Sequence, residues 1–289
     1  MTVRLFSILL LLAATAASAQ TPGPFATFDA ASGPVLNGPQ DLAMGPDGLL
    51  YIADKFADRI TVMDPETLEV VRYVGAGKML RVSDISISPD GRALAALTGG
   101  GGAMLFDGLS TADPEPVGGY RAKYTAGALI HSTGRLFVVA TALGVLGAFD
   151  GSNWVGGAPG HVGAHDVAEA PNGDVWLADI SLQRLVRYSK DLEYRQTLDG
   201  AKFGFISPQY MDVDPWGRLI VADEDTHQIF LIDPDGPEGG TLLGVLGDGV
   251  PGNGPNKFNE PEGVLADAGR YFFADSGNNR IVRYVVVLN

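Results

Sequence analysis

The stretch PQDLAMGPDGLLYIAD, residues 39–54, carries the pattern that decides the fold of this chain. It contains a short apolar segment, a turn that ends in glycine, and a second apolar segment that ends in aspartate. A tight hairpin needs a residue with positive φ, so the glycine marks a turn between two antiparallel strands. The same pattern occurs five more times, in VSDISISPDGRALAAL from Val82, TAGALIHSTGRLFVVA from Thr125, AHDVAEAPNGDVWLAD from Ala164, PQYMDVDPWGRLIVAD from Pro208 and PEGVLADAGRYFFAD from Pro261. The chain therefore contains six copies of one hairpin.

The spacing of these copies predicts the architecture. A repeat of about forty residues with several strands per unit is typical of the blades of a propeller. The first copy continues into two more apolar segments, RITVMD and VVRYVG, so each blade should have four antiparallel strands. The turn glycines that set the spacing are Gly48, Gly91, Gly134, Gly173, Gly217 and Gly269. We therefore predict an all-β chain folded as a six-bladed β-propeller.

The two ends of the chain predict how the ring closes. Only twenty residues follow Gly269, which is enough for the second and third strands of the last blade but not for a fourth. The segment at residues 25–30 precedes the first copy and has no other partner. Because an unpaired strand edge invites aggregation, we expect this N-terminal strand to complete the last blade.

The first nineteen residues are typical of a secretion signal rather than of a folded element. Arg4 supplies a positive charge, residues 5–14 form a short apolar run, and the small residues Ala17, Ser18 and Ala19 resemble a cleavage site. The run is too short to span a bilayer comfortably, so we expect no membrane insertion. We predict cleavage after Ala19 and a propeller domain at residues 20–289, located in the periplasm or secreted.

Composition excludes several classes of function. Acidic side chains outnumber basic ones by 34 to 20, which gives a formal net charge of −14 and argues against a nucleic-acid partner. The absence of cysteine excludes disulfides, thiolate metal sites and cysteine nucleophiles. Neither a nucleophile elbow nor a phosphate-binding glycine loop occurs in the sequence.

A second pattern follows the hairpin in four copies. The terminal aspartate is followed five residues later by arginine or glutamine and then by an aliphatic residue, as in Asp54, Arg59 and Ile60. The other three sets are Asp179, Arg184 and Leu185; Asp223, Gln228 and Ile229; and Asp275, Arg280 and Ile281. We expect these aspartates to hydrogen-bond within their own hairpins and the arginines to brace them.

These residues resemble the NHL repeat, and the sixth copy, FNEPEG…FFADSGNNRIVRY, is nearly a consensus member. The resemblance covers the mature chain, although copies two and three lack the aspartate and the arginine. It extends to streptogramin lyases and peptidyl-hydroxyglycine amidating lyases and, more remotely, to gluconolactonase-type lactonases. It implies a propeller that acts either on a ligand or as a binding scaffold.

Topology places the candidate functional residues. In an up-and-down blade, the loop that enters the first strand and the loop between strands two and three lie on one face, which we call the mouth face. The residue after each opening position should therefore ring the mouth of the central channel. Those residues are Gln40, Ser83, Ala126, His165, Gln209 and Glu262. Most of their polar chemistry lies in blades four to six, where we expect a ligand to bind.

The ring discriminates among the enzymes that the resemblance suggests. Amidating lyases hold zinc with three histidines from separate blades, but only His165 lies at a ring position here. A lactonase needs several oxygen ligands for calcium, and Glu262 is the sole carboxylate of the ring. Streptogramin lyases combine a histidine, a glutamate and a divalent cation, for which His165 and Glu262 are candidates.

Two hypotheses stay open at this point. The first is an exported binding module that takes a small molecule, peptide or protein at the mouth face. Its ligand-binding residues would be Gln40, Gln209, His165, Glu262 and Phe203. The alternative is a metal-assisted lyase or hydrolase with His165 and Glu262 as catalytic residues and one divalent cation as cofactor.

Overall fold

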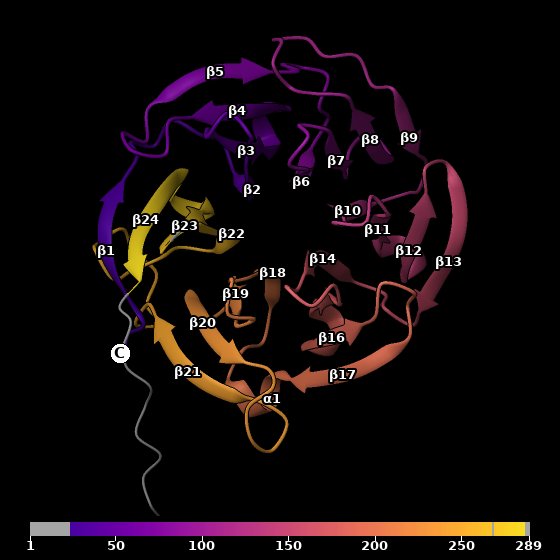
Figure 1. Ribbon diagram of the computed structural model, residues 1–289. Coiled ribbons are helices and arrows are strands. Elements are labelled where there is room, and N and C mark those ends of the chain that lie inside the picture. Colours follow the sequence, from indigo (N-terminus) through magenta and orange to yellow (C-terminus); the bar gives the residue numbers. More distant parts are fainter. Residues whose placement is uncertain (1–23, 268, 287–289) are drawn as a thin grey trace, which may run out of the picture.

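The computed structural model describes residues 24–267 and 269–286, and they form a ring of six four-stranded antiparallel sheets (Figure 1). The six-bladed β-propeller predicted from the repeats is confirmed. Each sheet is one blade, and its first strand faces the central channel while its last lies at the rim (Figure 1). Within the described ranges no helix is long and apolar enough to cross a membrane.

Each of the first five blades takes four strands in chain order. Blades 1 and 2 consist of β2 (Pro39–Met44), β3 (Leu50–Asp54), β4 (Arg59–Met63) and β5 (Val70–Val74), then β6 (Val82–Ile87), β7 (Ala93–Leu97), β8 (Gly102–Phe106) and β9 (Gly118–Tyr120). Blades 3 and 4 consist of β10 (Thr125–Ile130), β11 (Leu136–Ala140), β12 (Val145–Asp150) and β13 (Asn153–Pro159), then β14 (Ala164–Glu169), β15 (Val175–Asp179), β16 (Arg184–Tyr188) and β17 (Tyr194–Asp199). Blade 5 consists of β18 (Pro208–Val213), β19 (Leu219–Asp223), β20 (Gln228–Asp233) and β21 (Thr241–Leu246).

Blade 6 combines both ends of the described chain. It contains β22 (Pro261–Asp267), β23 (Arg270–Asp275), β24 (Arg280–Val286) and the N-terminal strand β1 (Ala26–Ala31), which pairs antiparallel with β24. Phe25, which precedes β1, is buried against the edge of Tyr271, at 5.7 Å between ring centroids. The predicted closure of the ring by the N-terminal strand is confirmed.

Short helical turns complete the architecture. Four are 3₁₀ turns that join the second and third strands of a blade: η1 (Lys55–Ala57), η2 (Thr141–Leu143), η3 (Ile180–Leu182) and η4 (Ser276–Asn278). The α-helix α1 (Gly200–Phe203) lies in the loop between blades 4 and 5. The hairpin turns between the first and second strands depend on glycine: in blade 1, for example, Gly48 has a φ of 75°.

The recurrent aspartates fasten four of the six blades at the mouth face. In blade 1, Asp54 accepts hydrogen bonds from the Arg59 guanidinium at 2.9 Å and from the Asn37 backbone N–H at 2.7 Å. Asp275 repeats this with Arg280 and Asn259, both at 2.7 Å. The predicted bracing by arginine is confirmed, and each carboxylate also holds the loop that enters its blade.

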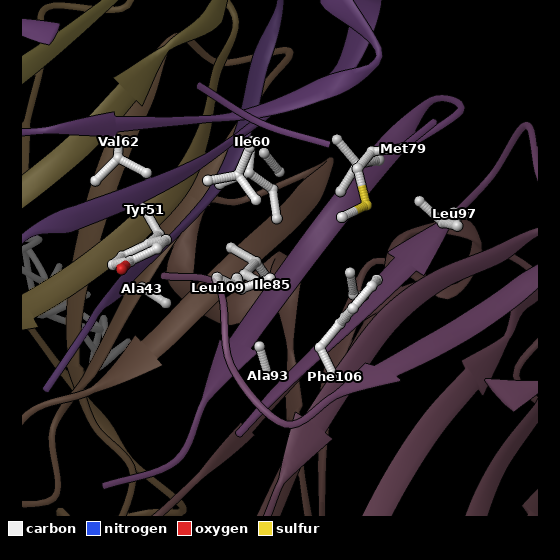
Figure 2. Packing of buried hydrophobic residues seen from close by; sticks show 14 residues of the cluster. Ala43, Tyr51, Ile60, Val62, Met79, Ile85, Ala93, Leu97, Phe106 and Leu109 are labelled. Atoms are coloured by element: carbon white, nitrogen blue, oxygen red, sulfur yellow. The ribbon is translucent and has the colours of Figure 1, made fainter. Parts of the chain in front are cut away.

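The same loops supply a side chain that fills the space between neighbouring blades. Three residues before the first strand, five of the six loops carry a side chain that is at most 6% exposed: Leu36, Met79, His161, Phe205 and Phe258. We call this the plug position. Figure 2 shows one example, in which Met79 packs between Ile60 of blade 1 and Leu97 of blade 2. The loop that enters blade 3 carries only Ala122 at the plug position.

Candidate functional site

The six predicted ring residues occupy the second positions of the innermost strands, and they differ in accessibility. Ser83 and Ala126 are buried, and the Ser83 hydroxyl donates to the Ala126 carbonyl at 2.9 Å. This bond joins blades 2 and 3, so neither residue has polar chemistry left to offer. Gln40 is buried as well, at 2% exposure, whereas His165, Gln209 and Glu262 are half-buried.

Tyr210 spans the channel next to the ring. It projects from blade 5, and its hydroxyl donates to the Ser83 carbonyl of blade 2 at 2.6 Å. Figure 1 shows blades 2 and 5 on opposite sides of the ring. The hydrogen bond of Tyr210 therefore joins opposite sides of the channel. Tyr210 is fully buried, and burial raises the pKa of its phenol well above the usual value, so it stays a neutral hydrogen-bond donor.

Lys55 brings a positive charge to the mouth. It begins the turn η1 of blade 1, and its ammonium donates to Gln40 Oε1 at 2.8 Å. Burial lowers the pKa of Lys55, and the nearby Glu262 and Glu224 partly oppose this shift. Burial also raises the pKa of Glu262 to about 8, against the opposing effect of Lys55. Near neutral pH the mouth therefore combines a lysine ammonium with a largely protonated Glu262.

His165 is held as a neutral imidazole. Its ring packs edge-on against Tyr210, at 4.9 Å between centroids, and its Nδ1 atom is buried with no hydrogen-bond partner among the described residues. Burial and the charge of Lys55 lower the pKa of His165 to about 3. A neutral imidazole with an unused nitrogen can accept or donate one hydrogen bond to a ligand.

A cavity of about 470 Å³ opens beside these groups. Its polar lining comes from Lys55, Arg81, Thr98, Tyr124, Thr141 and His165. The hydroxyl of Thr141 is a second buried polar atom without a partner in the described part of the chain. The cavity therefore lies over blades 1 to 4. We expected a ligand to bind at the ring residues of blades 4 to 6, but of these residues only His165 lines the cavity.

The other predicted ligand-binding residues lie at or behind the mouth. The Gln209 amide donates to the carboxylate of Glu224, so this pair is satisfied internally. Phe203 is 3% exposed and stacks on Phe205 in the apolar core between blades 4 and 5. It has no free surface for a ligand, because α1 turns its ring inward between the blades.

The remaining histidines have structural partners. His161 bonds to Asp179 at 3.0 Å and to the Tyr188 hydroxyl at 2.7 Å, and so occupies the plug position of blade 4. His131 lies in a turn on the opposite face, and His227 accepts a backbone N–H at 3.1 Å. Among the residues that the structure describes, no group of three or more His, Asp or Glu side chains is placed to hold a metal ion.

The ring does not fit a divalent cation. Gln40 Oε1, a neutral oxygen of the ring, already accepts the Lys55 ammonium, and burial raises the pKa of Glu262 to about 8. A dication would have to displace Lys55 and ionise Glu262 in the same small space, which is unfavourable for a hard cation that needs several oxygen ligands.

Below Tyr210 the channel contains four carboxylates, of which those of Asp84 and Asp166 are buried and those of Asp41 and Asp212 are half-buried. Asp41, Asp84, Asp166 and Asp212 line a separate cavity of about 280 Å³ that does not include the ring residues. Three of them accept a backbone N–H from the next blade, as Asp166 does from Met211 at 2.7 Å. Burial raises the pKa of Asp212 to about 6. These carboxylates connect the innermost strands.

Sequence reasoning missed the residues that reach the mouth from elsewhere in the fold. Lys55 lies directly after the braced Asp54, at a turn position where the other blades carry no lysine. Tyr210 directly follows a ring residue, and its long aromatic side chain was the feature of the sequence that could have indicated a contact across the channel. Arg81 and Thr141 come from loops whose approach to the channel depends on the curvature of the ring.

Comparisons with known proteins agree on the fold. No protein-family model and no curated protein matches this sequence. Virginiamycin B lyase from Staphylococcus aureus superposes with a TM-score of 0.62 over 87% of this chain and 96% of its own, at 12% identity. The β-propeller domain of Cps50 (Swd1) from Myceliophteria thermophila has a TM-score of 0.64 over 91% and 100%, at 13% identity. A protein of unknown function from Bacteroides thetaiotaomicron has a TM-score of 0.68 over 92% and 73%, at 15% identity.

These likenesses show a β-propeller, and the resemblance to streptogramin-lyase-type propellers is confirmed at the level of fold. The neighbours include both an enzyme and a propeller domain of a different kind, so the fold is compatible with catalysis and with binding. The assignment to the NHL repeat remains a prediction.

Proposed function

We propose that this chain is an exported binding module whose channel mouth takes a small anionic ligand, such as a carboxylate. The observation that carries the proposal is the cavity beside Lys55, Arg81 and His165. Most lysines and arginines of the described residues pair with a carboxylate, but Lys55 and Arg81 do not. In a chain with a net charge of −14, two such cations beside one cavity favour an anion as the ligand.

The unpartnered polar atoms support a polar ligand rather than an apolar one. His165 Nδ1 and the Thr141 hydroxyl are both buried without partners in the described ranges, and each is costly to leave unsatisfied. A ligand with a carboxylate for the cations and one or two hydroxyl or amide groups for these atoms would satisfy the whole set. Tyr210, which spans the channel next to the ring, would limit such a ligand to the mouth face.

The alternative, a metal-assisted lyase or hydrolase with His165 and Glu262, has less support. Its neutral imidazole and protonated carboxyl group would suit proton transfer. However, the cation that it requires does not fit the ring, because the Lys55 ammonium already bonds to the Gln40 side-chain oxygen. The similarity to virginiamycin B lyase, at 12% identity, concerns the fold only.

A thermal-shift titration with a panel of small mono- and dicarboxylates and inorganic phosphate tests the proposal. A ligand at a hundred times its dissociation constant adds about 2.7 kcal/mol to the free energy of unfolding. For a chain of this size that raises Tm by about 5 °C. Lys55→Met should abolish the shift, while Lys190→Met, which removes an exposed, ion-paired lysine on the opposite face, should keep it. The proposal is wrong if no anion stabilises the wild type more than Lys55→Met.

A further inference from the structure

The interface between blades 2 and 3 contains an open apolar cavity of about 480 Å³. Its apolar walls include Val138, Leu143, Val145, Phe149 and Trp154, and Leu143 and Trp154 are more than half exposed at its rim. This volume lies within the usual range of about 300–1,000 Å³ for small-molecule sites. The cavity is separate from the mouth, because the lining residues of the two do not overlap.

The cavity exists because blade 3 departs from the repeat at three structurally linked positions. Where blade 1 carries the plug Leu36, the aspartate Asp54 and the bracing Arg59, blade 3 carries only small or apolar residues. These are Ala122, Ala140 and Val145, and all three line the cavity. The loop entering blade 3 lacks the aspartate bonds that fasten the loops of blades 1, 4, 5 and 6, and without a plug it does not fill the gap.

The loop that replaces the plug carries positive charge. Arg121 lines the cavity, and Lys123 follows two residues later on the same loop. Neither side chain forms an ion pair with any residue that the structure describes, whereas Arg135, Arg184 and most other cations do. An apolar cavity beside unneutralised cations is complementary to a molecule with an apolar body and an anionic group.

We propose that this cavity, the unplugged interface, binds a small amphipathic anion. The aromatic or aliphatic body of the ligand occupies the space that a plug side chain fills in the other interfaces, as Met79 does in Figure 2. Its carboxylate or sulfonate pairs with Arg121, and Trp154 covers one side of the body. The site takes its ligand independently of the mouth.

Two fluorescent probes of matched shape test the proposal. Anilinonaphthalenesulfonate (ANS) has an aromatic body and one anionic group, and N-phenylnaphthylamine has a similar body without charge. Titration of the intact mature protein should show saturable ANS binding at one molecule per chain. Bound ANS should quench the fluorescence of Trp154, and this quenching should be lost in Trp154→Phe. Arg121→Glu should weaken ANS about tenfold or more, since a charge-assisted contact contributes about 1.5–3 kcal/mol. The affinity for the neutral probe should change less than about twofold.

Restoring the plug provides the second test. Ala122→Phe places a side chain like Phe205 or Phe258 in the cavity and should abolish binding of both probes while Tm stays equal or rises. Ala122→Met, which copies the plug Met79 of blade 2, decides the matter if the phenylalanine variant does not fold. Lys190→Glu carries the same charge change as Arg121→Glu at a remote site and should leave both affinities unaltered.

The inference is overturned if the wild type binds neither probe, or if every plug variant that folds binds ANS as the wild type does. The pairing of the anionic group with Arg121 is refuted if Arg121→Glu keeps the wild-type affinity for ANS. None of these outcomes bears on the mouth, because Lys55 and His165 do not line this cavity.

Discussion

The closure of the ring by the N-terminal strand predicts a large effect from a residue that lies outside every repeat. Phe25 precedes β1, is 6% exposed, and packs with Tyr271 and Phe258 in the core between blades 5 and 6. Phe→Ala in a packed core costs about 3–5 kcal/mol, which includes the edge-on contact with Tyr271. We take about 3 kcal/mol for Phe25→Ala, because this residue stands at the end of its strand.

That loss can be converted into a thermal shift. The entropy of unfolding is about 2.1 cal/mol/K per residue, so a chain of this size loses roughly 5 °C in Tm for 3 kcal/mol. Urea denaturation should show a lower midpoint with an unchanged slope, because the same surface is exposed on unfolding. The matched control is Val285→Ala: Val285 pairs with Thr27 of β1 but is 45% exposed, so its free energy of unfolding should change by less than about 0.5 kcal/mol.

A second variant separates strand pairing from side-chain packing. Deletion of residues 24–31 removes β1 and leaves the outer edge of β24 unpaired. Exposed strand edges associate with one another, so size-exclusion chromatography should show oligomers or aggregate. The reasoning is refuted if Phe25→Ala melts with the wild type, or if the deleted protein remains a monomer of unchanged Tm.

Three further predictions follow from the channel and the N-terminus. Glu262 and Asp212 have raised pKa values, of about 8 and about 6, so the folded state binds more protons than the unfolded state. The free energy of unfolding should therefore fall as pH rises from about 4 to about 8. The loss should be roughly 3 kcal/mol for Asp212 alone. Glu262→Gln should flatten this dependence between about pH 6 and 8 in a series of urea titrations, and an unchanged slope would contradict the assignment. Tyr210→Phe leaves the buried Ser83 carbonyl without its donor and should cost about 1–3 kcal/mol in the same assay, whereas an unaltered midpoint would mean that the bond across the channel contributes nothing. Intact-mass measurement of the exported product should give a chain that begins at Gln20 without a lipid, and a mass that includes Met1 would exclude cleavage.

The fold could be predicted because each structural signal recurs. A turn glycine, a braced aspartate and an opening residue at fixed spacing make the same local bonds in several blades, so one blade explains the others. Closure by β1 was predictable from counting strands. The ring positions were predictable for the same reason, since the period of the repeat fixes which residue of each blade faces the channel.

The chemistry of the mouth depends on side-chain contacts that the spacing of the sequence repeat does not predict. Tyr210 reaches across the axis to Ser83, which depends on side-chain length and on ring diameter. Lys55 reaches Gln40 from a turn of the same blade, which depends on side-chain length. Phe203 shows the converse error, because an aromatic residue in a mouth-face loop can turn inward between blades instead of facing a ligand. Side-chain direction in loops was therefore the part that sequence spacing could not give.

The departures from the repeat have a physical meaning that unites both proposals. Copies two and three lack the aspartate and arginine, which at the sequence level indicates only degeneracy. In the structure, blade 3 carries Ala140 and Val145 at these positions, and Thr141, next to Ala140, keeps its hydroxyl unpartnered beside the mouth. A repeat position that no longer fastens its blade leaves volume and polar atoms without an internal partner. Blades 2 and 3 therefore border both cavities. The loops that enter these two blades carry the cations Arg81, Arg121 and Lys123. None of the three forms an ion pair among the described residues, so all stay available to an anionic ligand.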